Sequence, residues 1–298
     1  MKDFIKFRDV KGGQDLFMAR PVSDNKVKSF FIFSGVKSGS TLLNNLIQLY
    51  TNQVNLPVLN IPGFIFEQGI PLPNARLADS SVFTRQGYGY IGWRSYWEDL
   101  PDLNNDHYNH VVLVRDPRDR LVSLYFAIAY SHSKSKKGVL KDQLLSNRKN
   151  ALQSVDDVND WVFREPKFIP AIINSYRYFL NRLSSHSTRI YRYEDVIFRK
   201  LEWMVDMVEF LGLPFRKDII NEVVEKMDVS VSGERKDQHI RQVNPGNHLK
   251  HFTPETIAYL DSQFDDILKT YDYLNMESNH SNDICFGREG KNQHLLYA

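Results

Sequence analysis

Residues 33–43, FSGVKSGSTLL, combine the residue types that bind phosphate groups. Glycines let the backbone approach an anion closely, hydroxyl side chains donate hydrogen bonds, and lysine supplies a point charge. The common nucleoside-triphosphate loop reads G-x-x-x-x-G-K-[ST], with its lysine after the last glycine. Here Lys37 precedes Ser38 and Gly39. The loop therefore places its cation differently from an ATPase.

The flanking sequence sets this loop between a strand and a helix. Ser29–Ser34 is a continuous apolar run, typical of a strand buried on both faces. Residues 41–50 repeat apolar side chains along one helical stripe. A helix N-terminus directs unpaired N–H groups and a positive dipole end at the loop, which favours an anion. The alternative is a tight turn with an incidental lysine. The residues predicted to hold a phosphate are Lys37, Ser38, Gly39, Ser40 and Thr41.

A second segment, residues 111–126 (VVLVRDPRDRLVSLYF), repeats the order of strand, turn and helix. Val111–Val114 predicts another buried strand, and Asp116 followed by proline is a typical helix start. Arg115 leaves the strand beside that helix start, where an arginine can bind a second phosphate. From this segment alone, an ion pair of Arg115 with Asp116 or Asp119 is the favoured alternative.

The rest of the chain continues the alternation. The pattern predicts a strand at 188–193, helices at 201–211 and 215–227, and a last helix from Thr253-Pro254 to about residue 271. Strands alternating with helices favour an α/β fold with a parallel sheet covered on both faces. We expect one domain over residues 1–298, with a core at about 28–271 and a polar tail at 278–298.

Residues 55–108 differ from this pattern, because they are rich in proline, glycine and asparagine. We expect long loops over the carboxyl edge of the sheet, where open α/β folds bind ligands. Aromatic residues at 88–97, Trp93 and Trp97 among them, and those around Tyr125–Tyr130 suggest a small or ring-containing ligand, or a sugar. The alternative is that these aromatic side chains belong to the core.

The composition limits the classes of protein to which the chain can belong. The chain has 298 residues, 42% of them hydrophobic, and a net charge of +2, so no global charge points to nucleic acid. The single cysteine, Cys285, excludes an intrachain disulfide and fits a reducing cytoplasm. No apolar run is long enough for a signal peptide or a membrane span. We expect a cytoplasmic protein with no membrane partner.

Taken together, KSGSTLL after one strand and RDPRDRLVSLY after another resemble the sulfotransferase family. YRYEDV (191–196) is similar to the family strand that ends in Tyr-Glu-Asp-Leu, and RQVNPGNHLKHFT (241–253) resembles its late loop R-K-G-x-x-G-D-W-x-x-x-F-T. The four segments occur in family order over roughly residues 28–271. The resemblance implies a P-loop nucleotide-binding fold.

The resemblance also implies the donor and the residues that bind it. Members use 3′-phosphoadenosine 5′-phosphosulfate (PAPS), without a metal, and release adenosine 3′,5′-bisphosphate (PAP). The first loop would hold the 5′-phosphosulfate. Arg115, Ser123 and Arg241 would reach the 3′-phosphate, and Tyr193 would lie near the adenine. Lys37 would then sit early in the loop because it stabilises the bridging oxygen that leaves sulfur.

The sequence departs from the family pattern in three places. Gln242 and Val243 replace the usual Lys-Gly of the late loop, and His248 replaces its tryptophan. Leu42 stands where many soluble members carry a tryptophan that stacks on adenine. These changes put the backbone contacts of the late loop and the stacking contact in question.

The general base is not fixed by the family pattern. Residues 90–97, YIGWRSYW, lack the histidine that soluble members carry at this place. Other branches use a glutamate after the first helix, so Glu67 is the predicted base, with an ordinary exposed acid as the alternative. Weaker candidates are His107, His110 and His132.

Two other functions remain open from the sequence. A metal-dependent kinase or NTPase is one, since VVLVRD resembles a strand that ends in a magnesium-binding aspartate, Asp116. The early Lys37 counts against it. A non-catalytic nucleotide-binding module is the other. Neither the acceptor nor the oligomeric state can be read from the sequence, beyond a small-molecule or saccharide acceptor with a hydroxyl or amine.

Overall fold

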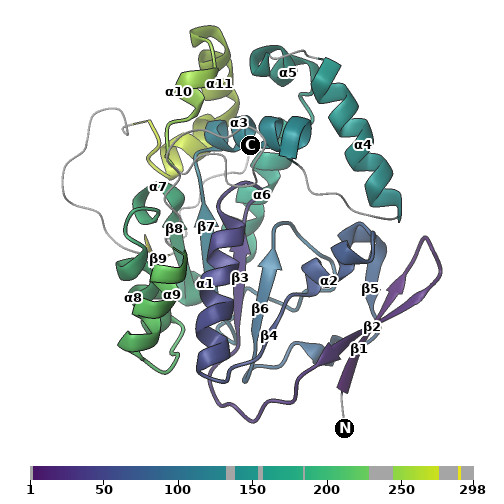
Figure 1. Ribbon diagram of the computed structural model, residues 1–298, viewed down its shortest axis with the longest axis vertical. Coiled ribbons are helices and arrows are strands. Elements are labelled where there is room, and N and C mark those ends of the chain that lie inside the picture. The colour runs from purple at the N-terminus through teal and green to yellow at the C-terminus, as the bar shows by residue number, and fades with distance from the viewer. Residues whose placement is uncertain are drawn as a thin grey trace.

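The computed structural model describes residues 3–131, 138–153, 157–183, 185–227, 244–274 and 288–289. Its centre is a six-stranded sheet in the order β4-β6-β3-β7-β8-β9 (Figure 1). The first five strands are parallel and the last is antiparallel to β8. This confirms the predicted α/β fold. In sheet order the strands are β4 (Val58–Leu59), β6 (Gly89–Trp93), β3 (Phe30–Ser34), β7 (Asn109–Val114), β8 (Thr188–Arg192) and β9 (Arg288–Glu289).

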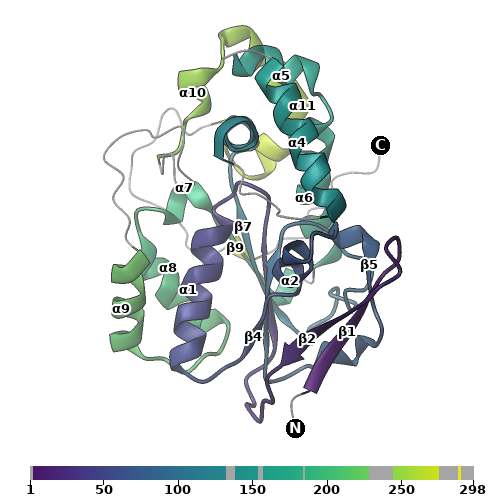
Figure 2. The same ribbon diagram turned by 45° about the vertical axis from the view of Figure 1, so that its right-hand side comes forward.

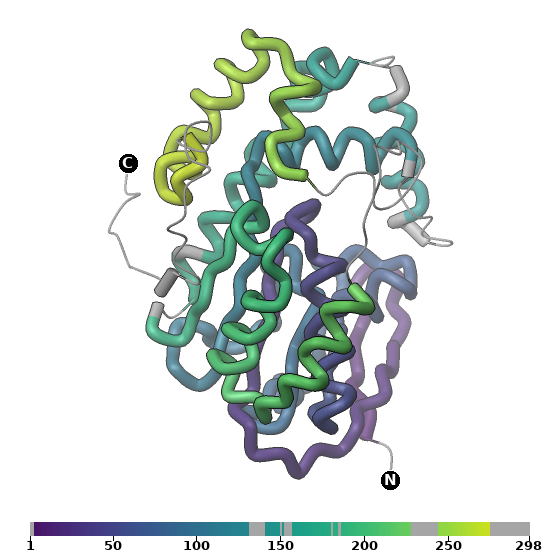
Figure 3. The backbone as a smooth tube through the Cα atoms, turned by 60° about the vertical axis from the view of Figure 1, so that its left-hand side comes forward, coloured from purple at the N-terminus to yellow at the C-terminus, as the bar shows by residue number. Residues whose placement is uncertain are grey.

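Helices cover both faces of this sheet, which is why its central strand β3 is buried throughout. In β3 the side chains alternate: Phe30 and Ile32 join one core cluster, and Phe31 and Phe33 join the other. The first cluster packs against α1 (Ser40–Gln53), α8 (Lys200–Phe210) and α9 (Lys217–Met227). Figure 3 shows α8 and α9 in green, side by side in front of α1. The second packs against α3 (Pro117–Phe126), α6 (Phe168–Arg182) and α11 (Pro254–Thr270).

Further elements gather at the carboxyl ends of the strands. Figures 1 and 2 both show α4, α5, α10 and α11 beyond that edge. None of the helices in the described ranges has the length and apolar character that crossing a bilayer requires. The bounds are α2 (Ile61–Glu67), α4 (Gly138–Gln153), α5 (Val158–Arg164), α7 (Tyr193–Val196) and α10 (His248–His251), with 3₁₀ turns at Leu72–Asn74, Ser80–Val82 and Ser185–Ser187 and a π-helical turn at Ala127–Ser131.

A small second sheet was not predicted. Its order is β2-β1-β5, and it lies beside the β4 and β6 side of the main sheet (Figure 1). Its strands are β1 (Asp3–Asp9), β2 (Asp15–Arg20) and β5 (Ala75–Leu77), all antiparallel. Phe7 on β1 has no exposed surface and packs against Trp97, so this sheet extends the core of the same domain.

The prediction of long loops at 55–108 was wrong, because this segment contains β4, α2 and β5 and also the five-residue strand β6. Two glycines hid this strand from the apolar pattern. Across the pair, Phe31 faces Tyr90 but Phe33 faces Trp93, so β6 carries one extra residue. This bulge lies at Gly92, whose φ of 88° is in the left-handed region. The ligand interpretation of Trp93 and Trp97 was wrong too, because they are 0% and 1% exposed and stack at 5.8 Å in the core.

Replacing Gly92 tests how much the conformation of the bulge contributes to the free energy of unfolding. An added Cβ would lie 2.1 Å from Oδ1 of Asn60, and the positive φ would be strained as well. Gly212 is a matched control, because its φ is 64° and a Cβ added there would have no other atom within 4 Å. We expect Gly92→Ala to lower the free energy of unfolding by at least about 1 kcal/mol more than Gly212→Ala in urea titrations. Equal losses of unfolding free energy in the two variants would show that the Asn60 side chain can move away from the added Cβ without an energetic cost.

Candidate active site

The phosphate-binding loop forms a tight turn between β3 and α1. The Ser38 N–H donates to the Gly35 carbonyl at 3.1 Å, and Lys37 and Gly39 both have positive φ, 66° and 92°. The helix α1 begins at Ser40 without a side-chain cap. Its first N–H groups have no partner within the helix and face the turn. The local geometry is that of an anion site.

The side chains predicted to bind phosphate in this loop differ in their exposure to solvent. Lys37 is half-buried, Ser40 is buried and Thr41 is exposed. Ser38 is fully buried, and its Oγ has no hydrogen-bond partner. Buried hydroxyls in folded proteins normally have a partner, so an orphaned one in this loop fits a ligand that supplies an acceptor.

Arg115, directly after β7, and Tyr193 of α7 complete this group. The guanidinium stacks on the Tyr193 ring at 4.5 Å, and a Cβ on Gly39 would come within 2.9 Å of that ring. Arg115 also pairs with Asp119 at 3.2 Å, the alternative that the sequence favoured. Its Nε is nevertheless buried without a partner. The structure thus brings three predicted segments together and leaves a second buried donor for a ligand.

Asp119, which the sequence did not single out as functional, joins this arginine to the late loop. Its carboxylate is fully buried and accepts from Arg115, from the Gly246 N–H at 3.0 Å and from the His248 N–H at 2.9 Å. The His248 Nδ1 lies at 2.7 Å. Burial acts to raise the pKa of Asp119, but the hydrogen bond from His248 and the charge of Arg115 outweigh it and lower the pKa to about 2.

These contacts account for one departure from the family pattern, the histidine at position 248, and for the use of two backbone N–H groups of the late loop. The N–H groups of Gly246 and His248 are used by a carboxylate of the protein. His248 is buried, and its ring contributes polar contacts that tryptophan in its place could not make through Nδ1.

Arg120 holds the phosphate-binding loop in place by a hydrogen bond to the backbone of the loop. It lies on α3, is 2% exposed, and donates through Nε to the Val36 carbonyl at 2.9 Å. Its guanidinium carbon would lie 2.6 Å from a Cβ at Gly35, so only glycine allows this approach. It also stacks on Tyr176 at 5.0 Å. The sequence did not single out Arg120, because its burial and its contact with Val36 depend on the tertiary structure.

Asp116 has a structural role that weakens the magnesium hypothesis. It caps α3 by accepting from the Arg118 N–H at 2.8 Å, and its other oxygen accepts from Nη2 of Arg118 at 2.7 Å. Within the described ranges no cluster of three potential metal ligands occurs. The Asp116 N–H donates to Glu194 Oε1 at 2.9 Å, and burial raises the pKa of Glu194 to about 8.

Other predicted residues lie apart from this group or outside the described residues. Ser123 is half-buried on α3, one helical turn after Asp119 and on the same stripe. Glu67 is exposed as the last residue of α2. Arg241 and His132 lie outside the described residues.

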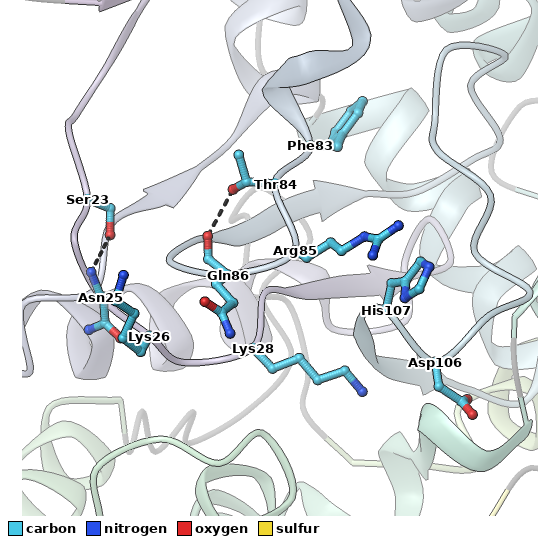
Figure 4. Close-up of a pocket in the computed structure, with 10 residues that line it drawn as sticks. All are labelled: Ser23, Asn25, Lys26, Lys28, Phe83, Thr84, Arg85, Gln86, Asp106 and His107. Carbon is cyan, nitrogen blue, oxygen red and sulfur yellow. Dashed lines mark hydrogen bonds between the residues drawn. The ribbon is translucent and has the colours of Figure 1, made fainter.

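The other two histidines are at the wrong end of β7 for catalysis. His110 is fully buried near the start of the strand, its Nδ1 lies 3.2 Å from Thr188 Oγ1, and burial lowers its pKa to about 3. His107 precedes the strand. It lines a hollow of about 880 Å³ with Lys28 and Arg85 (Figure 4). This hollow lies at the amino ends of the strands, opposite the phosphate-binding loop.

Comparisons with known proteins agree with this geometry. Residues 97–272 match the family model of the sulfotransferase domain, which includes Arg115, Ser123 and Tyr193 but begins after the loop at 35–39. The mouse sulfotransferase SULT7A1, solved in complex with PAP, covers 87% of this chain and 91% of its own, with 14% identity and a TM-score of 0.51. Retinol dehydratase, solved with androsterone and the inactive cofactor PAP, covers 90% of both chains, with 15% identity and a TM-score of 0.48. No curated protein matches the sequence.

The low pKa of Asp119 predicts a specific loss of stability in acid. The folded pKa of about 2 is below the ordinary 3.8, so the contribution is complete above about pH 4 and is lost as the pH falls towards 2. A shift of this size corresponds to about 2–3 kcal/mol. We expect the unfolding free energy of the wild type to fall by about that much more between pH 5 and 2 than that of Asp119→Asn, in urea titrations. Parallel curves for the two proteins would contradict the assignment.

Proposed function

Because the chain belongs to the sulfotransferase domain family, we propose that it transfers a sulfuryl group from PAPS to a hydroxyl or amine of a small-molecule or saccharide acceptor. The observation that carries this proposal is the meeting of the Lys37 loop, Arg115 and Tyr193 at one edge of the sheet. The domain we propose comprises residues 1–298, with its core at about 28–271.

The donor-binding residues follow from this meeting point. The loop from Ser38 to Thr41 and the N-terminus of α1 would hold the 5′-phosphosulfate. Arg115, with Ser123 and Arg241, would bind the 3′-phosphate, and Tyr193 would lie near the adenine. Two donor atoms, Ser38 Oγ and Arg115 Nε, support this placement. Both are buried without a protein partner, whereas buried polar atoms normally have one.

Bound PAPS would supply an activated sulfuryl group joined to its 5′-phosphate through a bridging oxygen. A bond from sulfur to the oxygen or nitrogen of the acceptor would form while the S–O bond to this bridging oxygen breaks, and negative charge would grow on the 5′-phosphate. Lys37 stabilises that charge, and the helix dipole of α1 adds to it. Arg120 holds the Val36 carbonyl, so the loop need not reorganise as the charge develops.

Glu67 would accept the proton of the acceptor. Its carboxylate is exposed, and none of the described residues forms a hydrogen bond or an ion pair with it. Such a carboxylate is accessible to a substrate. It ends α2, the helix that follows β4, and so approaches from the side of the sheet away from Arg115.

Lys37→Ala tests the mechanism. We expect kcat for transfer from PAPS to fall by about 10²–10³-fold, because one preorganised charge at the leaving oxygen is lost. Product formation by mass spectrometry over a panel of hydroxyl and amine acceptors gives the rate. Circular dichroism should show an intact fold, and PAP should still raise the melting temperature more than ATP with Mg²⁺. Unchanged turnover would refute the role of Lys37, and absence of turnover in the wild type would favour a binding module.

Glu67→Gln tests the general base. Glutamine keeps the size of the side chain but cannot take a proton, so kcat should fall by about 10²–10⁴-fold and the acidic limb of the pH–rate profile should disappear. Glu98→Gln, at another exposed acid, is the control. A profile of Glu67→Gln that keeps its acidic limb would assign the base elsewhere.

A further inference from the structure

The carboxyl edge of the sheet has two halves, on either side of β3. The proposed donor residues Arg115 and Tyr193 follow β7 and β8, which lie on one side of it. The strands β6 and β4 lie on the other. In-line transfer requires the acceptor to approach sulfur from the side opposite the leaving phosphate. The acceptor is therefore expected over β6 and β4.

Arg94 lies at this acceptor half, directly next to the phosphate-binding loop. It follows Trp93, the last residue of β6, and Trp93 pairs in register with Phe33 of the neighbouring β3. Arg94 is therefore level with Ser34, the residue that precedes the loop. The bulge at Gly92 fixes this position, because the Gly92 N–H donates to Asn44 Oδ1 on α1 at 3.3 Å.

Arg94 has no partner among the residues that the structure describes, neither an acid, a carbonyl nor an aromatic ring. The other arginines at this edge are engaged: Arg115 with Asp119, Arg118 with Asp116, and Arg120 with the Val36 carbonyl. Arg94 is exposed to solvent. The surrounding protein nevertheless lowers its pKa by desolvation, and no carboxylate opposes that effect. The guanidinium is therefore accessible to a ligand beside the phosphate-binding loop and has no counter-ion among the described residues.

We propose that Arg94 binds an anionic group on the acceptor, so that the enzyme sulfates a hydroxyl compound that already carries a carboxylate or sulfate. This inference rests on the proposed function and deepens it. The planar guanidinium presents paired N–H donors that match two oxygens of a carboxylate or sulfate, and such charge-assisted pairs are among the stronger hydrogen bonds in proteins. Arg94 would orient the acceptor, and Glu67 would accept the proton of its hydroxyl.

The test uses two ligands that differ at one substituent, which is charged in one ligand and neutral in the other. 4-Nitrophenyl β-D-glucuronide carries a carboxylate where 4-nitrophenyl β-D-glucoside carries a hydroxymethyl group. Their dissociation constants are measured by calorimetry on the full chain saturated with PAP. We expect the wild type to bind the glucuronide at least about tenfold more tightly, as for a hydrogen bond to a charged group. In Arg94→Met this ratio should fall to about 1, with an intermediate value in Arg94→Lys.

Arg85→Met is the matched control, because Arg85 is also exposed but lines the hollow at the opposite edge (Figure 4). It should keep the wild-type ratio. Equal affinities of the wild type for the two ligands, no binding of either, or a preference that survives in Arg94→Met would overturn the proposal. Failure of PAP itself to bind the wild type is a different outcome, because it would refute the proposed function.

Discussion

The buried carboxylate of Asp119 is the interaction on which the proposed donor site depends. It accepts from Arg115, from two backbone N–H groups of the late loop and from the ring of His248. Taking a carboxylate out of water costs several kcal/mol, and only such a set of donors offsets that cost. Because the donors come from β7 and the late loop while Asp119 lies on α3, one group fixes three segments. Removing Arg115 or Asp119 would leave the other charge buried without its opposite charge.

The neighbouring Arg120 fixes the phosphate-binding loop in the same way. Its bond to the Val36 carbonyl requires the absence of a side chain at Gly35, and its stacking on Tyr176 holds the guanidinium in place. The loop glycines thus have separate uses. Gly35 admits a positioning side chain, whereas Gly39 adopts the left-handed backbone and lies against the Tyr193 ring. A rigid loop is what a reaction that depends on charge stabilisation requires.

The order of the strands places the proposed donor residues and the proposed acceptor residue on opposite sides of β3. With β3 in the middle, the arginine after β7 and the tyrosine after β8 lie on one side, and the arginine after β6 lies on the other. Arg115 is held by an acid of the protein, but Arg94 has no such partner among the described residues. This contrast suggests that the first arginine is preorganised for a constant donor, whereas the second is left for the charge of the acceptor.

The sequence by itself determined the strands at β3, β7 and β8, the helices α1, α3, α8, α9 and α11, and the α/β class, because local periodicity and helix-start signals are written in consecutive residues. It also marked Lys37, Arg115 and Tyr193, since motifs preserve the spacing of groups that contact one ligand. It missed β6, where Gly89 and Gly92 interrupt the apolar pattern, and it mistook core tryptophans for ligand contacts. Only the tertiary structure decided that Asp119 joins the late loop, that Arg120 holds the Val36 carbonyl and that Arg94 has no partner among the described residues. These contacts join segments that are far apart in the sequence. The order of the strands in the sheet decides which segments meet, and local sequence does not reveal that order.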